Sequence, residues 1–270
     1  MRSVTEPGDS FVPPDQRIAT FDNDGTLWCE RPMYPQADFL VRPVGEQVTA
    51  DPTLAEQQPW KAVAEGDRSW LAAALDHLPE LIKGVTEAYD GVTTEDFDAA
   101  VRAFFDTAKH PTLGVAYTQI AFRPMCELID FLRAHDFDVY ICSAGGRDFV
   151  RVIAHEMYGL RRTHVIGSGT TLEYRDGAVY RTKGIELPVA DGPGKPVHIW
   201  TRTGQRPLLA GGNADGDVEM LETARFALLI RHDDAAREFA YDTSAQRALA
   251  RAGERGWTMV SMKDDFETVF

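Results

Sequence analysis

The sequence RIATFDNDGT, at residues 17–26, is the clearest indication of the fold. A short apolar run leads directly into a turn with two carboxylates, which is typical of a buried parallel strand. In an open α/β sheet the binding crevice lies at the carboxyl ends of the strands. We therefore expect Asp22 and Asp24 to lie at a sheet edge where a ligand binds.

Further strand signals alternate with helical patterns later in the chain. An Asp-Gly pair at residues 176–177, flanked by alternating side chains, predicts a hairpin. The alternation predicts an α/β fold with a doubly wound, Rossmann-like, mostly parallel sheet. The other apolar runs of strand length lie at 138–143, 164–167, 207–212 and 226–230.

The segment from residue 30 to residue 121 has a different character. Prolines are frequent at its start, and apolar residues then recur at helical spacing over 71–78 and 97–105. The second of these patterns follows a plausible capping box at 93–96. We predict a flexible N-terminal tail over 1–16, a catalytic core over 17–29 and 122–270, and a helical cap over 30–121.

Composition excludes several classes of protein. The 270 residues include 28 Lys and Arg against 42 Asp and Glu, which gives a net charge of −14, and no basic cluster suits nucleic acid. No apolar window is long enough for a membrane span, so we expect neither nucleic acid nor membrane as a partner. Three scattered cysteines (Cys29, Cys126, Cys142) and a polar N-terminus favour reduced thiols and a cytoplasmic location.

Polar groups follow several of the predicted strands. Ser143 ends one strand, residues 212–217 follow another, and Lys195 lies between them after a Gly-Pro-Gly turn. Several carboxylates in one crevice repel one another unless a cation is present, and all-oxygen ligands suit Mg²⁺. A hydroxyl, a lysine and glycine-rich turns suit a phosphate group.

The order of these elements resembles the haloacid dehalogenase superfamily, and in particular its Mg²⁺-dependent phosphatases. Residues 21–27 resemble the first motif, Ser143 the second, Lys195 the third and residues 212–217 the fourth. The cap between the first two motifs resembles that of phosphoserine-phosphatase-like members. The resemblance runs over most of the chain.

The resemblance implies a phosphatase that acts through an aspartyl-phosphate on Asp22. Asp24 would protonate the leaving oxygen and then activate water, which requires a raised pKa. Ser143 and Lys195 would hold the phosphoryl oxygens. The backbone N–H groups around Ala144 and Gly145 would add to this anion site.

The same resemblance implies the metal ligands. Mg²⁺ would be held by the Asp22 carboxylate, the Asp24 backbone carbonyl and the fourth motif, where Asn213 and Asp217 are candidates and Asp215 is a further one. The family usually has an aspartate at the position of Asn213. We expect this change to weaken cation binding by about 1–3 kcal/mol, on the scale of a charged against a neutral ligand.

Glu30 and Arg31 lie where the chain enters the cap. In phosphoserine-phosphatase-like proteins an acid at the cap entry helps to recognise an ammonium group, whereas a solvated hinge pair is an equally good interpretation here. The cap would close over the crevice, which favours a small phosphorylated metabolite over a protein substrate.

Three other functions share this scaffold. A phosphotransferase or phosphomutase would use the same aspartyl-phosphate. A 2-haloacid dehalogenase needs neither the metal nor the acid, so Asp24 argues against it. A non-catalytic ligand-binding member is the alternative that Asn213 supports best.

Overall fold

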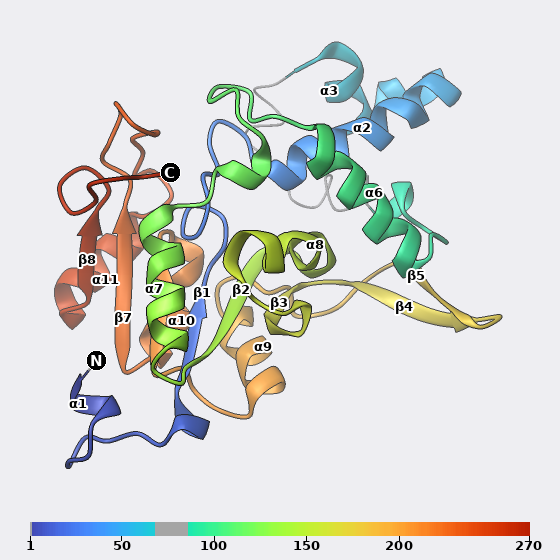
Figure 1. The fold of residues 1–270 in the computed structure, drawn as a ribbon. Helices are drawn as coiled ribbons and strands as arrows, with labels where there is room; N and C mark the ends of the chain where they lie inside the picture. Colours follow the sequence, from blue (N-terminus) through green and yellow to red (C-terminus); the bar gives the residue numbers. More distant parts are fainter. Residues whose placement is uncertain (1, 68–85) are drawn as a thin grey trace. The chain divides into compact units, whose positions relative to one another are not determined.

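The computed structural model describes residues 2–67 and 86–270. It contains a six-stranded sheet of order β3-β2-β1-β6-β7-β8, in which every neighbouring pair is parallel. The doubly wound α/β fold predicted from the sequence is confirmed (Figure 1). The strands are β1 (Ile18–Phe21), β2 (Asp138–Gly146), β3 (Val165–Ser168), β6 (Leu209–Gly212), β7 (Phe226–Arg231) and β8 (Thr258–Ser261).

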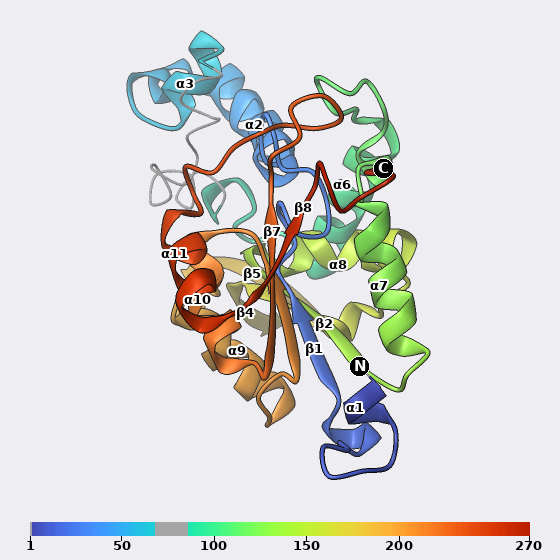
Figure 2. The same cartoon turned by 90° about the vertical axis from the view of Figure 1, so that its left-hand side faces the viewer.

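Helices cover both faces of this sheet. Viewed along the sheet edge, α7 lies on one side of the strands and α9, α10 and α11 lie on the other (Figure 2). All four residues of β1 are buried because this strand lies in the middle of the sheet with helices on both faces. The helices are α7 (Arg123–Arg133), α8 (Arg147–Tyr158), α9 (Gly194–Thr203), α10 (Val218–Thr223) and α11 (Gln246–Arg255).

The local sequence explains where these helices begin and end. A proline lies in the first turn of α7, where its missing N–H costs nothing, and Met125, Ile129 and Leu132 bury one face. Helix α8 ends at Gly159, whose φ of 64° is the left-handed conformation that glycine adopts readily.

The described chain divides into two compact units. The core unit comprises Met1–Cys29, Thr118–Ser168 and Pro188–Phe270, and the second unit comprises Glu30–Tyr117 and Gly169–Leu187. The second unit contains the helices α2 (Pro35–Ala50), α3 (Trp60–Glu65) and α6 (Thr94–Thr107), and the hairpin strands β4 (Thr170–Arg175) and β5 (Ala178–Ile185). The helix predicted over 71–78 lies outside the described residues.

The hairpin is the main difference from the predicted boundaries, which placed it in the core. Its turn has the expected geometry, with φ of 50° at Asp176 and 88° at Gly177. However, β5 pairs with the segment before α6: the Arg181 N–H donates to the Val92 carbonyl at 2.8 Å, and the Gly91 N–H donates to the Arg181 carbonyl at 2.9 Å. These contacts join it to the second unit.

Aromatic side chains form the interior of the second unit. Phe39 stacks on Tyr89 with ring centroids 5.5 Å apart, and Phe104 stacks on Tyr117 at 5.5 Å. The Arg181 guanidinium lies 3.8 Å from the Phe97 ring centroid. The hairpin and the helices of this unit therefore share one interior.

The N-terminal segment also differs from expectation. We predicted a flexible tail over 1–16, whereas the structure has a short helix α1 (Arg2–Thr5) and a 3₁₀ turn at Pro14–Gln16. Val4 is fully buried, and its carbonyl accepts the Val12 N–H at 2.9 Å. The apolar side chain of Val4 explains why this polar segment folds back.

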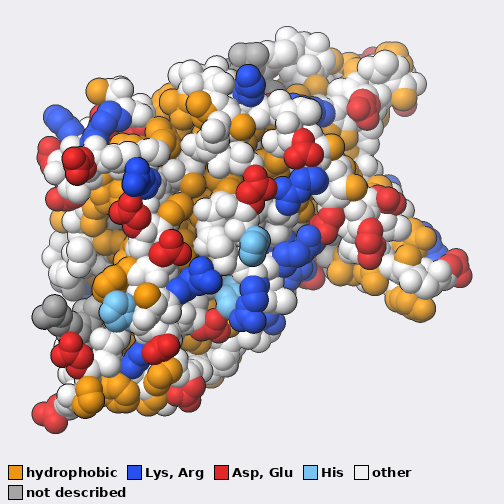
Figure 3. All heavy atoms as spheres, in the orientation of Figure 1, with side chains coloured by type: hydrophobic (Ala, Val, Ile, Leu, Met, Phe, Trp, Pro, Cys, Tyr) orange, Lys and Arg blue, Asp and Glu red, His pale blue; other side chains and the backbone are white. Residues whose placement is uncertain are grey.

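The molecular surface carries charges of both signs. Acidic and basic side chains are interspersed over the face in Figure 3. Within 2–67 and 86–270, no helix is both long and apolar enough to cross a membrane.

Candidate active site

Strand β1 brings Asp22 to the carboxyl edge of the sheet. The Asp22 N–H donates to the Gly211 carbonyl at 3.0 Å, which continues the pairing of β1 with β6 beyond the end of the strand. The Phe21 ring lies directly over Gly211, where a β-carbon would overlap it. The backbone at Asp22 is thus fixed by the sheet, and its side chain is only 9% exposed.

Lys195 is the partner of Asp22. It lies in the first turn of α9, and its ammonium group donates to Asp22 Oδ1 at 2.5 Å, Asp217 Oδ1 at 2.7 Å and the Cys142 carbonyl at 2.9 Å. A lysine ammonium has three protons, so all its donors are used. The first, third and fourth sequence motifs therefore meet around one buried cation.

Asp217 anchors the loop that follows β6. Its Oδ2 accepts the Asn213 N–H at 2.9 Å and the Ala214 N–H at 3.0 Å, while its Oδ1 faces Lys195. Both carboxylate oxygens therefore have partners within the protein. This arrangement favours a structural role for Asp217, and it leaves Asn213 as the better candidate of the two for a metal.

Burial and charge act in opposite directions on these groups. Burial raises the pKa of Asp22 well above its ordinary value, although Lys195 opposes this effect. Burial would lower the pKa of Lys195, but the Asp217 and Asp22 carboxylates raise it above its usual range. Lys195 therefore stays charged and is the group that supports an anionic Asp22.

Asp24 lies two residues further on, in the turn. The Trp28 indole N–H donates to its Oδ1 at 2.8 Å, and the Ser143 hydroxyl lies 3.4 Å from its Oδ2. Burial raises the pKa of Asp24, and the Trp28 hydrogen bond partly offsets that rise. A carboxyl group with a raised pKa is suited to give up and regain a proton near neutral pH.

A family model described as haloacid dehalogenase-like hydrolase matches residues 19–222. The match includes Asp22, Asp24, Ser143, Lys195 and Asp217, and it spans well over half of the chain. The chain belongs to the haloacid dehalogenase-like hydrolases. The resemblance inferred from the order of the motifs is confirmed at the level of the family, and the chain is assigned as a hydrolase.

Solved structures share the fold of this haloacid dehalogenase-like hydrolase. A protein of unknown function from Bordetella pertussis Tohama I is 19% identical with a TM-score of 0.57, over 91% of this chain and 98% of that one. A functionally unknown protein from Anaerococcus prevotii DSM 20548 is 16% identical with a TM-score of 0.57, over 94% and 87%. Cytosolic 5′-nucleotidase IIIB bound to cytidine is 11% identical with a TM-score of 0.50, over 94% and 82%. A comparison with curated proteins gives no match.

The residues around Asn213 fit a magnesium ion in their chemistry. The candidate donors are the Asp22 carboxylate, the Asp24 backbone carbonyl and the Asn213 amide, and all three offer oxygen. Among the described residues, no group of three His, Cys, Asp or Glu side chains suits a metal, so amide and backbone donors would have to complete a site that begins with the Asp22 carboxylate.

The Asn213 side chain is itself only partly satisfied. Its Oδ1 accepts the Thr26 hydroxyl at 3.0 Å, while its Nδ2 is buried with no hydrogen-bond partner among residues 2–67 and 86–270. If the amide turned over, Thr26 would face the nitrogen and the oxygen would be left without a partner. A cation is a suitable partner for such an oxygen.

The remaining predicted site residues divide between the two units. Ser143 is fully buried within β2, and its hydroxyl accepts the Gly145 N–H at 3.0 Å. The Ala144 carbonyl accepts the Ser168 hydroxyl at 2.8 Å. Glu30 and Arg31 begin the second unit, with Arg31 Nε 3.8 Å from Glu30 Oε1, and their role in substrate recognition stays a prediction.

Sequence reasoning did not identify the groups that hold the turn in place. The Trp28 indole N–H donates to Asp24, and the Thr26 hydroxyl donates to Asn213. His232 contacts the Gly25 carbonyl at 2.7 Å. His232 directly follows β7. It thus carries the same signal, a polar residue at the carboxyl end of a buried strand, that identified Asp22.

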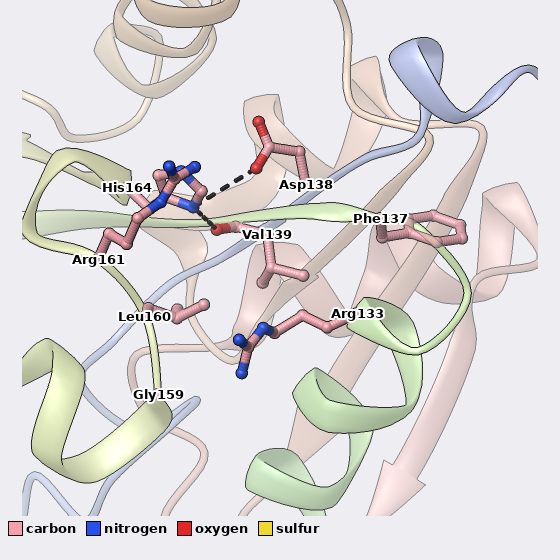
Figure 4. Close-up of a pocket in the computed structure, with 8 residues that line it drawn as sticks. All are labelled: Arg133, Phe137, Asp138, Val139, Gly159, Leu160, Arg161 and His164. Atoms are coloured by element: carbon pink, nitrogen blue, oxygen red, sulfur yellow. Dashed lines mark hydrogen bonds and ion pairs between the residues drawn. The ribbon is translucent and has the colours of Figure 1, made fainter.

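Two pockets lie in the core unit. One, of about 370 Å³, is lined by Asn213, His232 and Tyr241 and so adjoins the candidate site. The other, of about 270 Å³, lies at the amino end of β2, away from Asp22, with Arg133 and Arg161 among its lining residues (Figure 4).

His164 lies in the wall of the second of these pockets. Burial lowers its pKa, although the Asp138 carboxylate, 3.5 Å away, opposes this effect. Its Nδ1 lies 3.0 Å from the Val139 carbonyl (Figure 4). A neutral imidazole that donates to this carbonyl fits such a place, which indicates a structural role.

Proposed function

We propose that this hydrolase is a Mg²⁺-dependent phosphatase that cleaves a small-molecule phosphomonoester through an aspartyl-phosphate on Asp22. One observation carries the proposal. A buried carboxylate at the end of the central strand is held by a buried lysine at 2.5 Å, with a second carboxyl group of raised pKa two residues on. This pairing supplies a nucleophile and an acid within one turn.

The chemistry divides into two steps. The Asp22 Oδ2 oxygen attacks phosphorus, since Lys195 already binds Oδ1, and the bond from phosphorus to the leaving oxygen breaks. Asp24 gives its proton to that oxygen. In the second step Asp24 takes a proton from water, which attacks phosphorus, releases phosphate and restores the Asp22 carboxylate.

Mg²⁺ and Lys195 would together offset the negative charges of the carboxylates and the phosphoryl group. The Asp22 carboxylate, the Asp24 backbone carbonyl and Asn213 would hold Mg²⁺, which when bound reduces the repulsion between the carboxylates and an anionic phosphoryl group. Lys195 favours the anionic form of Asp22 and so opposes the burial that raises the pKa of this group. Because all three Lys195 donors are engaged, contact with a phosphoryl oxygen would replace one existing hydrogen bond, such as that to Cys142.

The substrate is assigned only by class. Ser143 and the backbone around Ala144 and Gly145 suit the phosphoryl group, while Glu30 and Arg31 in the second unit are candidates for recognising the remainder of the molecule. The 5′-nucleotidase that shares the fold is 11% identical, which supports the fold and no particular substrate.

Hydrolysis of para-nitrophenyl phosphate tests the proposal. We expect phosphate release that requires Mg²⁺, stops with chelator and falls at least about a thousandfold in Asp22→Asn. Asp130→Asn, an equivalent change at an exposed position of α7, serves as the control and should be unaffected. Full activity in Asp22→Asn, or in chelator, would overturn the proposal.

A further inference from the structure

A buried histidine and glutamate lie behind the turn that carries Asp24. His232 Nε2 is 2.7 Å from the Gly25 carbonyl oxygen, and its Nδ1 is 2.9 Å and 3.0 Å from the two carboxylate oxygens of Glu238. The side chains of His232 and Glu238 are 2% and 1% exposed. The chain thus encloses an ionisable pair of which one end touches the catalytic turn.

The contacts of the ring fix its orientation. A carbonyl oxygen can only accept, so the contact of Nε2 with Gly25 fits a ring that carries a proton on Nε2. Nδ1 faces both carboxylate oxygens of Glu238. Glu238 therefore holds the ring in the orientation that points Nε2 at the Gly25 carbonyl.

Several contacts restrain the backbone of Gly25. Its φ of 79° favours glycine, its N–H donates to the Trp28 carbonyl at 2.9 Å, and a β-carbon would overlap the Asn213 amide. The remaining polar group of Gly25 is the carbonyl that His232 binds. Since Gly25 directly follows Asp24, an anchor on the Gly25 carbonyl restrains the turn on which the Asp24 side chain stands.

The segment that carries Glu238 is itself firmly anchored. The Arg237 guanidinium donates to four backbone carbonyls, those of Met262, Lys263, Phe266 and Glu267, at 2.6–3.0 Å. The Tyr241 ring stacks on the His232 ring with centroids 4.4 Å apart. The pair therefore stands on a rigid support from the C-terminal part of the core unit.

We propose that His232 and Glu238 are positioning residues that fix the Gly25 carbonyl and thereby aim the Asp24 carboxyl group at the leaving oxygen. The inference rests on the proposed function. Burial of an ionisable pair costs desolvation and is weak evidence for stability alone. Its contact with a carbonyl in the turn that carries the general acid, one residue beyond Asp24, points to orientation of that acid.

Two substitutions at His232 separate positioning from general damage. In His232→Gln the amide nitrogen reaches about as far as Nε2 and can still donate to Gly25, whereas in His232→Asn it replaces Nδ1 and can bind only Glu238. Both variants lack the imidazole ring, and each keeps one of its two hydrogen bonds: His232→Gln keeps the bond to Gly25, and His232→Asn keeps the bond to Glu238. Melting temperatures of both verify that the comparison is between folded proteins.

The experiment compares two substrates at saturating Mg²⁺. Para-nitrophenolate leaves without a proton, whereas the alkoxide of β-glycerophosphate needs one, so only the second depends strongly on Asp24. We expect His232→Asn to lower kcat/KM for β-glycerophosphate by about ten- to a hundredfold and to change it much less for para-nitrophenyl phosphate. His232→Gln should recover most of the loss. Equal losses for both substrates, or for both variants, would overturn the inference.

Hydrogen exchange gives a readout that needs no turnover. We expect the amides of residues 22–29 to exchange faster in His232→Asn than in His232→Gln or the wild type, because the turn loses its anchor. Unchanged exchange in His232→Asn would refute the positioning role. A wild type that hydrolyses neither ester would instead refute the proposed function, and the exchange experiment would still decide whether His232 holds the turn.

Discussion

Lys195 is the residue on which the electrostatics of the site depend. It is 1% exposed and separates the Asp22 and Asp217 carboxylates, so its removal would leave two buried negative charges facing each other. Breaking a buried pair by removing one partner costs several kcal/mol, because the remaining charge has lost its hydration as well as its partner.

We therefore predict that Lys195→Met lowers the free energy of unfolding by about 3–5 kcal/mol. Urea denaturation in the presence of chelator measures this quantity without a contribution from a bound ion. Lys183→Met is the matched control: the Lys183 side chain is 62% exposed and its ammonium lies 3.8 Å from Asp90, so the expected loss is below about 1 kcal/mol. Similar losses in the two variants would show that the lysine does not compensate the carboxylates.

Among the elements, α6 shows how a local signal fixes the start of a helix. Thr93 stands at the N-cap, where its hydroxyl oxygen accepts the Asp96 N–H at 3.0 Å and its hydroxyl donates to Asp96 Oδ2 at 2.7 Å. The cap satisfies one of the N–H groups that the first turn leaves without a partner. Phe97, Val101, Phe104 and Phe105 then bury the inner face of the helix.

Thr93→Ala should therefore lower the free energy of unfolding by about 1 kcal/mol. The neighbouring Thr94 offers a control, because within the described ranges 2–67 and 86–270 its hydroxyl bonds only the Glu95 carboxylate next to it, at 2.9 Å. Chemical denaturation of both variants, followed by circular dichroism at about 222 nm, where helices give a strong signal, makes the comparison. A larger loss in Thr94→Ala than in Thr93→Ala would contradict the assigned cap.

The fold was predictable wherever its signals are local. Strand β1, the Thr93 cap of α6 and the Asp-Gly turn of the hairpin each depend on residues within a few positions of one another. Of the predicted capping box at 93–96, the structure has the bond from the Asp96 N–H to Thr93, while the Asp96 carboxylate binds the Thr93 hydroxyl. The attachment of the hairpin to the second unit depends on the contact of Arg181 with Gly91 and Val92, about ninety residues away, and nothing in the hairpin's own sequence marks it. The burial of Val4 could not be predicted either, because one apolar side chain in a polar segment produces no hydrophobic periodicity.

The residues of the candidate site were likewise predictable only where their signals are local in the sequence. Asp22, Asp24 and Lys195 were found because each lies in a strand-end or glycine-rich turn whose chemistry is visible in the sequence. His232 lies 207 residues from Gly25 and is one of seven histidines, so its contact with the turn that carries Asp24 emerges only from the fold. The paired parallel strands β1, β6 and β7 bring the two together at one edge of the sheet.

For the molecule as a whole, net charge opposes the proposed substrate. The chain carries a charge of −14, and a phosphomonoester is also an anion, so the long-range field repels it. Inside the site the balance is reversed only locally, by Lys195 and, in the proposed function, by Mg²⁺. Salt screens the long-range term over about 10 Å at 0.1 M but has much less effect on contacts within a buried site.

Salt weakens the long-range repulsion of the substrate but has little effect on the contacts within the site, and this difference predicts how the rate depends on salt. At saturating Mg²⁺ we predict that kcat/KM for para-nitrophenyl phosphate rises about two- to fivefold between about 0.01 M and 0.15 M salt, while kcat stays nearly constant, because screening speeds the encounter and leaves the bound state alone. The series is measured in both potassium chloride and potassium acetate, so that competition by one anion is recognised by a difference between the two. A fall in kcat/KM in both salts would show that the positive site, rather than the net charge, governs the approach of the substrate.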